Sequence, residues 1–470
     1  MTRPDAPPVP PAPPEPAGST VAQSFSQAFG SEPSGVWSAP GRVNLIGEHT
    51  DYNAGLCLPI ALPHRTYAAV RLRRDRRLRL QSLQSSGQYE LDLDDVRAGN
   101  PPGWGGYAAG VLWALQEAGH PVVGLDLMLD GQVPLGAGLS SSAALECSVA
   151  VAVSDLLDLG LTGDDDARAT LADICVNAEN TIAQAPTGGM DQAAALRCRV
   201  GHALLLDCRD GSIAQVPFDL SAHDLSLLIM DTRVEHALDD GQYAQRRASC
   251  EEAARQLGLS SLREVAFDDL DQTLDRLPDI TIRARTRHVV TEIERVRQTV
   301  ALLRAGRLPE VGPLFNASHA SMRDDFEISC PELDVAVEVA RTYGALGARM
   351  TGGPARSWKR PATSRSVVSR PLTGPRADRG HPAGPGRQAG VPEPGGPSGR
   401  WLVAGSRRQG WSESASRGMP FTATCSRVIL GGGGIHLTAP GVRRHYCLGL
   451  TVAAATTGGV AAPLPGAWGR

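Results

Sequence analysis

Apolar and polar positions follow strand-like and helix-like spacings through residues 21–353, without long linkers between them. Residues 36–46 alternate as a strand or hairpin does, and residues 67–80 alternate apolar with basic side chains, as one solvent-facing strand would. Residues 107–117 and 251–257 have helical spacing. This part of the chain is therefore predicted to be a globular mixture of strands and helices.

The composition limits the class of protein. A chain of 470 residues that is 42% hydrophobic can bury a large core, which predicts two or more domains. No stretch approaches the roughly 18 apolar residues of a membrane helix, and residues 1–18 contain eight prolines where a signal peptide would be apolar. The nine cysteines are scattered singly, which argues against a disulfide scaffold and a structural zinc. We expect a cytoplasmic protein with no membrane or nucleic-acid partner.

The charge is distributed very unevenly along the chain. Residues 354–470 hold sixteen basic and three acidic side chains, a net charge of +13, which leaves residues 1–353 with −17. The same tail is rich in Pro, Gly, Arg and Ser, a composition that does not offset the entropy cost of folding. A natural basic tail that touches nucleic acid or acidic partners is one interpretation. We favour a shift of reading frame in a GC-rich gene, because out-of-frame translation gives such a composition.

The segment VPLGAGLSSSAA at residues 133–144 carries the first chemical signal. It follows an alternating strand at 125–129 and precedes a helix with apolar residues from Leu145 onward. Gly136 and Gly138 let the backbone approach a ligand closely, and the serines stand where a helix start exposes unpaired N–H groups. No Lys follows the glycines, so this is not a Walker A loop. An ordinary glycine turn is the alternative, but the combination predicts phosphate binding.

The segment APGRVNLIGEHTDYNAG at residues 39–55 concentrates hydrogen-bonding side chains within a short stretch. They are Arg42, Asn44, Glu48, His49, Asp51, Tyr52 and Asn53. A surface loop can have this composition by chance. However, each hydroxyl of a sugar needs a donor and an acceptor held in place, so the cluster also fits a sugar site.

The segment AENTIAQAPTGGMDQ at residues 178–192 places Glu179 and Asp191 twelve positions apart. Two acidic residues at this spacing can simply be solvated. A phosphoryl transfer would instead use one carboxylate to hold Mg²⁺ and the other to accept a proton from the attacking hydroxyl.

Together these segments resemble the galactokinases of the GHMP small-molecule kinase family. GRVNLIGEHTDYN is similar to the galactokinase signature, and PLGAGLSSSAA is similar to the family's ATP loop. Further similar segments are GWGGYAAG at 103–110, GGMDQ at 188–192, GQYAQRRASCEEA at 241–253 and NASHASMRDDFEISCPELD at 316–334. The resemblance implies an α+β, two-domain GHMP kinase fold, with a ribosomal-protein-S5-like N-terminal domain and a ferredoxin-like C-terminal domain. The implied activity is ATP-dependent phosphorylation of D-galactose at C1.

The resemblance also implies a role for individual residues. Asp191 would be the catalytic base on the C1 hydroxyl, and Arg42 would orient it. The residues implied to bind the sugar are Glu48, His49, Thr50, Asp51, Gly188 and Tyr243. Those implied to bind ATP are Gly136, Ala137, Gly138, Leu139, Ser140, Ser141 and Ser142, with Trp104 and Tyr107 either beside the nucleotide or in the core. Ser142 and Glu179 would hold Mg²⁺.

One family feature is missing, and it coincides with the charge break. Galactokinases continue TYGALGARMTGG with a third glycine-rich motif close to GGFGG, whereas here Gly353 is followed by Pro354. We therefore expect a disordered lead-in at 1–20, an N-terminal domain at 21–220, a truncated C-terminal domain at 221–353 and a frameshifted tail at 354–470. Impaired turnover follows from the lost motif. A kinase of N-acetylgalactosamine or arabinose, or a non-catalytic protein that binds galactose and ATP, is the alternative.

A shift of reading frame makes a prediction that sequencing of the gene can check. In a neighbouring frame, the DNA after codon 353 should encode a Phe-Gly-Gly-like stretch followed by alternating apolar residues. The tail itself should make few long-range contacts. If no frame encodes that stretch, or if the tail is a compact, protease-resistant unit, the tail is a genuine extension instead.

Overall fold

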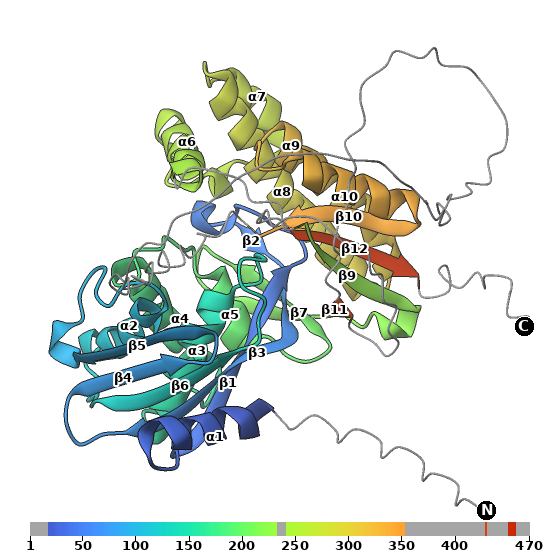
Figure 1. The fold of residues 1–470 in the computed structure, drawn as a ribbon. Coiled ribbons are helices and arrows are strands. Elements are labelled where there is room, and N and C mark those ends of the chain that lie inside the picture. Colours follow the sequence, from blue (N-terminus) through green and yellow to red (C-terminus); the bar gives the residue numbers. More distant parts are fainter. Residues whose placement is uncertain (1–16, 233–240, 353–427, 430–449, 457–470) are drawn as a thin grey trace, which may run out of the picture. The chain divides into compact units, whose positions relative to one another are not determined.

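A computed structural model describes residues 17–232, 241–352, 428–429 and 450–456, all within one compact unit of the chain (Figure 1). Its first sheet has the strand order β1-β3-β6-β4-β5, antiparallel except for the parallel pair β4 and β6. These strands are β1 (Gly35–Asn44), β3 (Pro59–Leu72), β4 (Arg77–Ser82), β5 (Ser85–Asp92) and β6 (Leu125–Gly131).

Helices cover both faces of this sheet. Ala69 and Met128 pack with Val21 and Phe25 of α1, whereas the neighbouring Ala68 belongs to the core formed with α2, α3 and α4. Because successive side chains of a strand point to opposite faces, α1 lies on one face and the other three helices on the opposite face. The bounds are α1 (Ala17–Phe29), α2 (Trp104–Glu117), α3 (Ser141–Leu156) and α4 (Asp165–Thr181).

A small antiparallel sheet, β2-β7-β8, and the short helix α5 complete the first half of the described chain. Their bounds are β2 (Leu56–Cys57), α5 (Met190–Arg197), β7 (His202–Asp207) and β8 (Ile213–Pro217). Single 3₁₀ turns lie at η1 (Asp51–Asn53), η2 (Leu93–Asp95), η3 (Ser221–His223), η4 (Leu262–Glu264), η5 (Phe267–Asp269) and η6 (Leu308–Val311).

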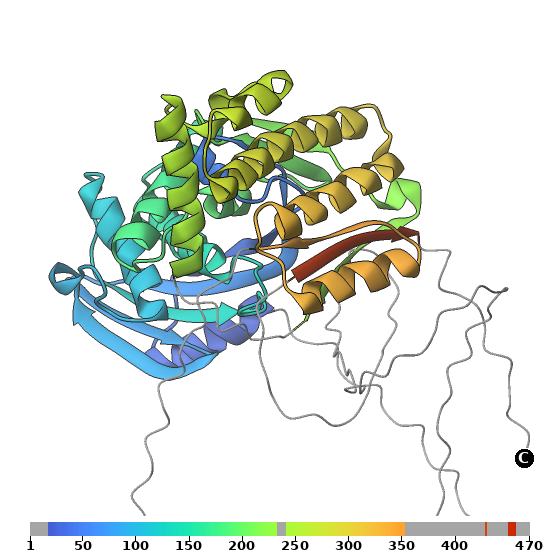
Figure 2. The ribbon, with the colours of Figure 1, turned by 90° about the horizontal axis from the view of Figure 1, so that it is seen from above.

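The second half has a four-stranded sheet in the order β10-β12-β9-β11, and α9 and α10 pack against β10 (Figure 2). The strands are β9 (Leu225–Asp231), β10 (Ala345–Thr351), β11 (Val428–Ile429) and β12 (Leu450–Thr456). The helices are α6 (Gly241–Leu257), α7 (Leu270–Asp275), α8 (Ile280–Arg304), α9 (Gly312–Asp324) and α10 (Pro331–Thr342). No helix within the described residues is long and apolar enough to span a membrane.

A single hydrophobic cluster joins the two halves. Leu45 and Ile46, just after β1, are fully buried in the same cluster as Val289 of α8 and Phe315 of α9. Burial of apolar surface here fixes the segment after β1 against the helices of the second half. The polar residues that follow Ile46 are therefore held between the two halves.

The expectation of few long-range contacts in the tail is wrong for the segment Leu450–Thr456. This segment is a strand that pairs with β10 from Ala345 to Thr351 and with β9 from Leu225 to Asp231. Its sequence LTVAAAT contains residues that suit a strand, although the composition of the whole tail does not. Residues 353–427, 430–449 and 457–470 lie outside the described residues, and the frameshift stays a prediction.

Two expectations about local structure also need correction. Residues 67–80 form the end of β3 and the start of β4 rather than one strand, because the chain turns at Asp75, whose carbonyl accepts from the N–H of Gly124 at 2.7 Å. The predicted lead-in at 1–20 is already helical from Ala17, and residues 1–16 lie outside the described residues. The predicted strand at 36–46 and the predicted helices at 107–117 and 251–257 are confirmed.

The position of β12 predicts unequal effects of two truncations. Deletion of residues 450–470 removes a strand that has partners on both sides, which leaves the backbone groups of β9 and β10 unpaired. Deletion of 457–470 keeps the strand. The first truncation should lower the thermal unfolding midpoint by several degrees, and the second should leave it unchanged. Equal midpoints in differential scanning calorimetry would show that β12 does not stabilise the sheet.

Candidate active site

Arg42 and Asp191 form an ion pair at the centre of the site. Arg42 lies on β1, and Asp191 lies in the first turn of α5, after the left-handed Gly189 with φ of 91°. Asp191 Oδ1 is 2.8 Å from Nε and 2.6 Å from Nη2 of Arg42. The hydroxyl of Ser140 donates to the other oxygen of Asp191 at 2.5 Å. The Asp191 side chain is still 22% exposed, so a ligand has access to its carboxylate.

The glycine-rich loop at residues 133–144 contacts this ion pair. Arg42 Nη1 donates to the carbonyl of Gly138 at 2.7 Å, and Gly138 has a φ of 68°, which favours glycine. A Cβ on Gly138 would lie 3.3 Å from Cα of Gly352, so the loop lies directly against the end of β10. Helix α3 begins at Ser141, and its start offers free N–H groups and a positive dipole end to an anion.

The loop after β1 has a constrained backbone. Gly47 has a φ of 97°, and a Cβ there would lie 2.4 Å from the carbonyl oxygen of Leu56. His49 also has a left-handed φ, of 61°. The hydroxyl of Thr50 is fully buried and shares its one proton between the carbonyls of Gly47, at 2.9 Å, and Leu56, at 2.8 Å. Thr50 therefore supports the loop from inside.

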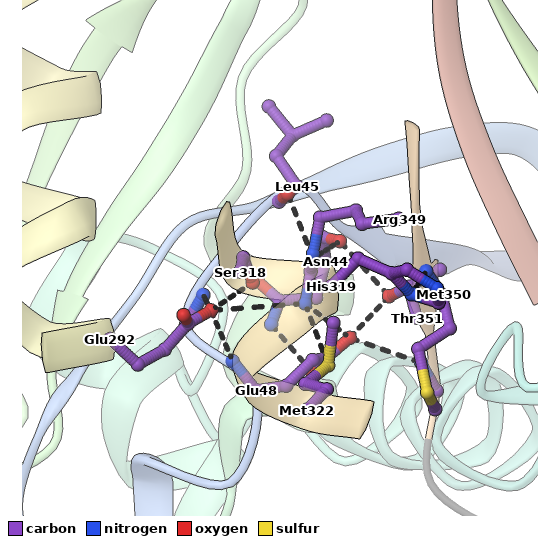
Figure 3. A network of polar contacts seen from close by, with 12 residues as sticks. Asn44, Leu45, Glu48, Glu292, Ser318, His319, Met322, Arg349, Met350 and Thr351 are labelled. Carbon is purple, nitrogen blue, oxygen red and sulfur yellow. Dashed lines mark hydrogen bonds and ion pairs between the residues drawn. The ribbon is translucent and has the colours of Figure 1, made fainter. Parts of the chain in front are cut away.

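Glu48 is buried within a network of polar contacts (Figure 3). Its carboxylate accepts from Asn44 Nδ2 at 2.8 Å, from the N–H of Gly352 at 3.0 Å and from the hydroxyl of Thr351. Burial alone would raise the pKa of Glu48, but the charge of Arg349 and these hydrogen bonds outweigh it and hold the pKa below its ordinary value. Glu48 is therefore an ionised acceptor.

His49 is a neutral group in this site. Burial lowers its pKa to about 3, and its Nδ1 lies 2.9 Å from the hydroxyl of Tyr52. Its ring stacks at a tilt against Phe326, with centroids 5.0 Å apart. A neutral imidazole has one donor and one acceptor nitrogen, which suits hydrogen bonding to a hydroxyl.

Asp51 and Gly188 lie in direct contact. A Cβ on Gly188 would come within 2.1 Å of Asp51 Oδ2, so only glycine fits beside this carboxylate. Burial, together with the negative charges of Asp191 and Glu48, raises the pKa of Asp51 to about 6. Asp51 and Glu48, two of the residues predicted to bind a sugar, thus lie within electrostatic range of the Arg42–Asp191 pair.

Ser142 and Glu179, the predicted metal ligands, are also brought together. The side chain of Ser142 hydrogen bonds to Glu179, and Gln192 Nε2 donates to the same carboxylate at 2.6 Å. Burial and the nearby charge of Asp191 raise the pKa of Glu179 to about 7. No group of three or more His, Cys, Asp or Glu within the described residues is placed to hold a metal. One hydroxyl and one carboxylate do fit Mg²⁺, which usually takes few protein ligands beside phosphate oxygens and water.

Trp104 and Tyr243 differ from the other predicted site residues, because one lies in the core and the side chain of the other lies outside the described residues. Trp104 is buried in the core and packs edge-on against Tyr89, with centroids 5.1 Å apart, so the core interpretation accounts for it. The side chain of Tyr243 lies outside the described residues, although its backbone belongs to α6. The contacts of both with a ligand stay predictions.

Several partners of the predicted residues were not predicted from the sequence. Gln192 bridges Glu179 and the fully buried Glu146, whose carboxylate accepts at 3.1 Å. Glu292 and Arg349 contact the loop after β1 from distant segments. Gln192 directly follows Asp191, and this position in the sequence could have indicated a role in the site. Glu292 and Arg349 lie far along the chain from the other site residues, and no motif marks them.

Comparison with known proteins adds an independent line of support. The model of the galactokinase galactose-binding signature matches residues 23–72. The models of the GHMP kinases N terminal domain and the GHMP kinases C terminal match residues 106–199 and 299–353. A galactokinase of Streptomyces coelicolor is 53% identical over 336 residues, which cover 71% of this chain and 86% of that protein. The chain belongs to the galactokinase family.

Other members of the galactokinase family agree with this assignment. A galactokinase of Mycobacterium tuberculosis is 45% identical over 317 residues, which cover 67% of this chain and 85% of that protein. The crystal structure of Lactococcus lactis galactokinase complexed with galactose matches with a TM-score of 0.67 and 35% identity, over 72% of this chain and 87% of that one. The GHMP kinase fold and the enzyme class expected from the sequence are confirmed.

The raised pKa of Asp51 predicts the pH dependence of sugar binding. If Asp51 binds the sugar as the resemblance implies, its ionised carboxylate accepts hydrogen bonds from sugar hydroxyls, and protonation takes up one oxygen and removes the charge, so galactose affinity should fall as the pH drops through about 6. The loss should be at most about tenfold per pH unit below the pKa, the limit reached when only the ionised form binds. His49 stays neutral and Glu48 ionised in this range. Calorimetric titration without ATP and Mg²⁺, from pH 5 to 7.5, measures the effect.

Asp51→Asn is the matched variant for this measurement, because the amide cannot titrate. It should bind more weakly with a flat profile. A pH dependence that persists in Asp51→Asn would assign it to another group, such as Glu179.

Proposed function

We propose that this member of the galactokinase family phosphorylates D-galactose at C1 with ATP and yields galactose 1-phosphate. The observation that carries the proposal is the contact of Arg42 with both Asp191 and the carbonyl of Gly138. This contact puts the candidate base where the candidate sugar loop and the candidate phosphate loop meet. The relatives named galactokinase, one of them in complex with galactose, support the choice of sugar.

In the proposed reaction, Asp191 accepts the proton of the C1 hydroxyl while that oxygen attacks the γ-phosphorus and ADP leaves. Proton transfer to a positioned carboxylate requires hydrogen-bond contact at about 3 Å. Arg42 and Ser140 hold the Asp191 carboxylate from two sides, which fixes its direction toward the sugar. Glu48, His49 and Asp51 supply the acceptors and donors for the remaining hydroxyls.

The phosphates of ATP would lie at the start of α3, where N–H groups and serine hydroxyls of residues 136–142 favour an anion. Ser142 and Glu179 would hold Mg²⁺, which neutralises charge on the phosphates when bound. The location that we propose for this reaction is the cytoplasm.

We further propose that turnover is reduced in this chain by the loss of the third glycine-rich motif. Gly352 donates its N–H to Glu48 and lies against Gly138, so it touches the sugar loop and the phosphate loop together. The match to the C-terminal family model ends at residue 353. The third glycine-rich motif, which is expected to line the site in a galactokinase, is thus replaced by a different sequence after Gly353.

The full chain should phosphorylate D-galactose in the presence of ATP and Mg²⁺, and D-glucose about a hundredfold less well, because a site that pairs a given hydroxyl discriminates against its misplacement. A version in which the third motif and its following strands are restored should be faster. Asp191→Asn should lose about two to four orders of magnitude in kcat and keep galactose binding. A coupled assay of ADP release measures all three proteins.

Turnover of D-glucose, the C4 epimer, at a rate comparable to that of D-galactose would contradict the assigned substrate. Full activity of Asp191→Asn would assign the base to another residue. Binding of galactose and ATP without turnover in the restored version would favour a non-catalytic homologue.

A further inference from the structure

Two oppositely charged, fully buried side chains lie beneath the loop that carries Glu48 and His49 (Figure 3). Arg349 comes from β10, and Glu292 comes from α8. Nη2 of Arg349 lies 3.5 Å from Glu48 Oε1 and 3.9 Å from Glu292 Oε1. The sugar loop of the first half therefore rests on charged groups of the second half.

These two side chains contact the loop mainly through its backbone. Arg349 Nη1 donates to the carbonyls of Asn44 at 3.1 Å and Leu45 at 2.8 Å. Glu292 Oε1 accepts from the N–H groups of Gly47 at 3.0 Å and, at a longer 3.4 Å, Glu48. Donors and acceptors on both sides of Ile46 are thus satisfied by the same pair.

Glu292 is itself held rigidly. Its Oε1 accepts from the hydroxyl of Ser318 at 2.7 Å, and its Oε2 accepts from Arg295 Nε at 2.7 Å. Burial alone would raise the pKa of Glu292, but the charges of Arg295 and Arg349 lower it to about 2. The carboxylate is therefore a fixed acceptor with little freedom to rotate.

The loop needs such external support because its own backbone is constrained. Gly47 and His49 both have left-handed φ angles, and a non-glycine residue in that region persists only when its surroundings determine it. His288 of α8 adds a further contact, with Nε2 3.1 Å from the carbonyl of Glu48. Without Glu292, buried N–H groups of the loop would lose their acceptor, which is costly.

We infer that Glu292 and Arg349 are positioning residues that set the geometry of Glu48 and His49 and thereby the affinity for the sugar. The inference rests on the proposed function, because it takes this loop as the sugar site. The phosphate loop contacts Arg42 and the backbone of Gly352, whereas Glu292 bonds to the sugar loop, to Ser318 and to Arg295. A change at Glu292 should therefore affect the sugar and leave the nucleotide unaffected.

Glu292→Gln in the full chain tests the inference. The amide keeps the shape but removes the charge that Arg295 and Arg349 face, so galactose Kd should rise about tenfold while ATP Kd changes less than about twofold. Amide hydrogen exchange at residues 47–49 of the free protein should become faster. Glu294→Gln is the matched control, because Glu294 lies on the same helix in a partly exposed ion pair with Arg297, and it should change none of these values.

Ser318→Ala is the milder variant should Glu292→Gln fail to fold. It removes one hydrogen bond to Glu292, and a rise of about threefold in galactose Kd is expected. Unchanged galactose affinity together with unchanged exchange at 47–49 would overturn the inference. Equal weakening of galactose and ATP would also overturn it, because it indicates general destabilisation. Failure of the unchanged chain to bind galactose would instead contradict the proposed function. Amide hydrogen exchange at residues 47–49 would still show whether Glu292 positions the loop.

Discussion

The organisation of the site depends on one side chain, Arg42. It reaches Asp191, 149 positions later in the sequence, and Gly138, 96 positions later, so a single guanidinium joins a strand, a helix start and a glycine-rich turn. A planar guanidinium suits this task because its donors point in fixed directions. The large core that surrounds β1 holds Arg42 in place, and the relative position of Asp191 and the glycine-rich loop follows from it.

Local signals in the sequence predicted much of the fold and part of the site. The strand, glycine turn and helix around residues 133–144 appear as expected, because each obeys a short-range backbone rule. The roles that we propose for Asp191 and Arg42 rest on the resemblance to galactokinases. Glu292 and Arg349 were not predicted, because both lie more than 240 positions from the loop they support and nothing in their own segments marks them.

The average composition of residues 354–470 did not reveal the short segment that forms a strand. The Arg, Pro and Gly content of this tail argues against folding over the full length 354–470, yet the apolar run LTVAAAT occupies a place between β9 and β10. Strands in a sheet pair through their backbones, so many different sequences can form a strand if their side chains suit one over a few residues. A sheet that lacks its inner strand can accept such a run, whatever reading frame encodes it.

The contact between Gly138 and Gly352 brings two stretches of bare backbone face to face. A Cβ on Gly352 would lie 3.0 Å from Cα of Gly138, so a methyl group at either position would push the glycine-rich loop and the end of β10 apart. Since Arg42 binds both the carbonyl of Gly138 and the carboxylate of Asp191, such a shift of the loop would also disturb the Arg42–Asp191 ion pair. In the proposed reaction, the absence of side-chain atoms at these two positions would therefore help to set the separation of sugar and phosphate, and alanine substitution at each position would show how much separation phosphoryl transfer tolerates.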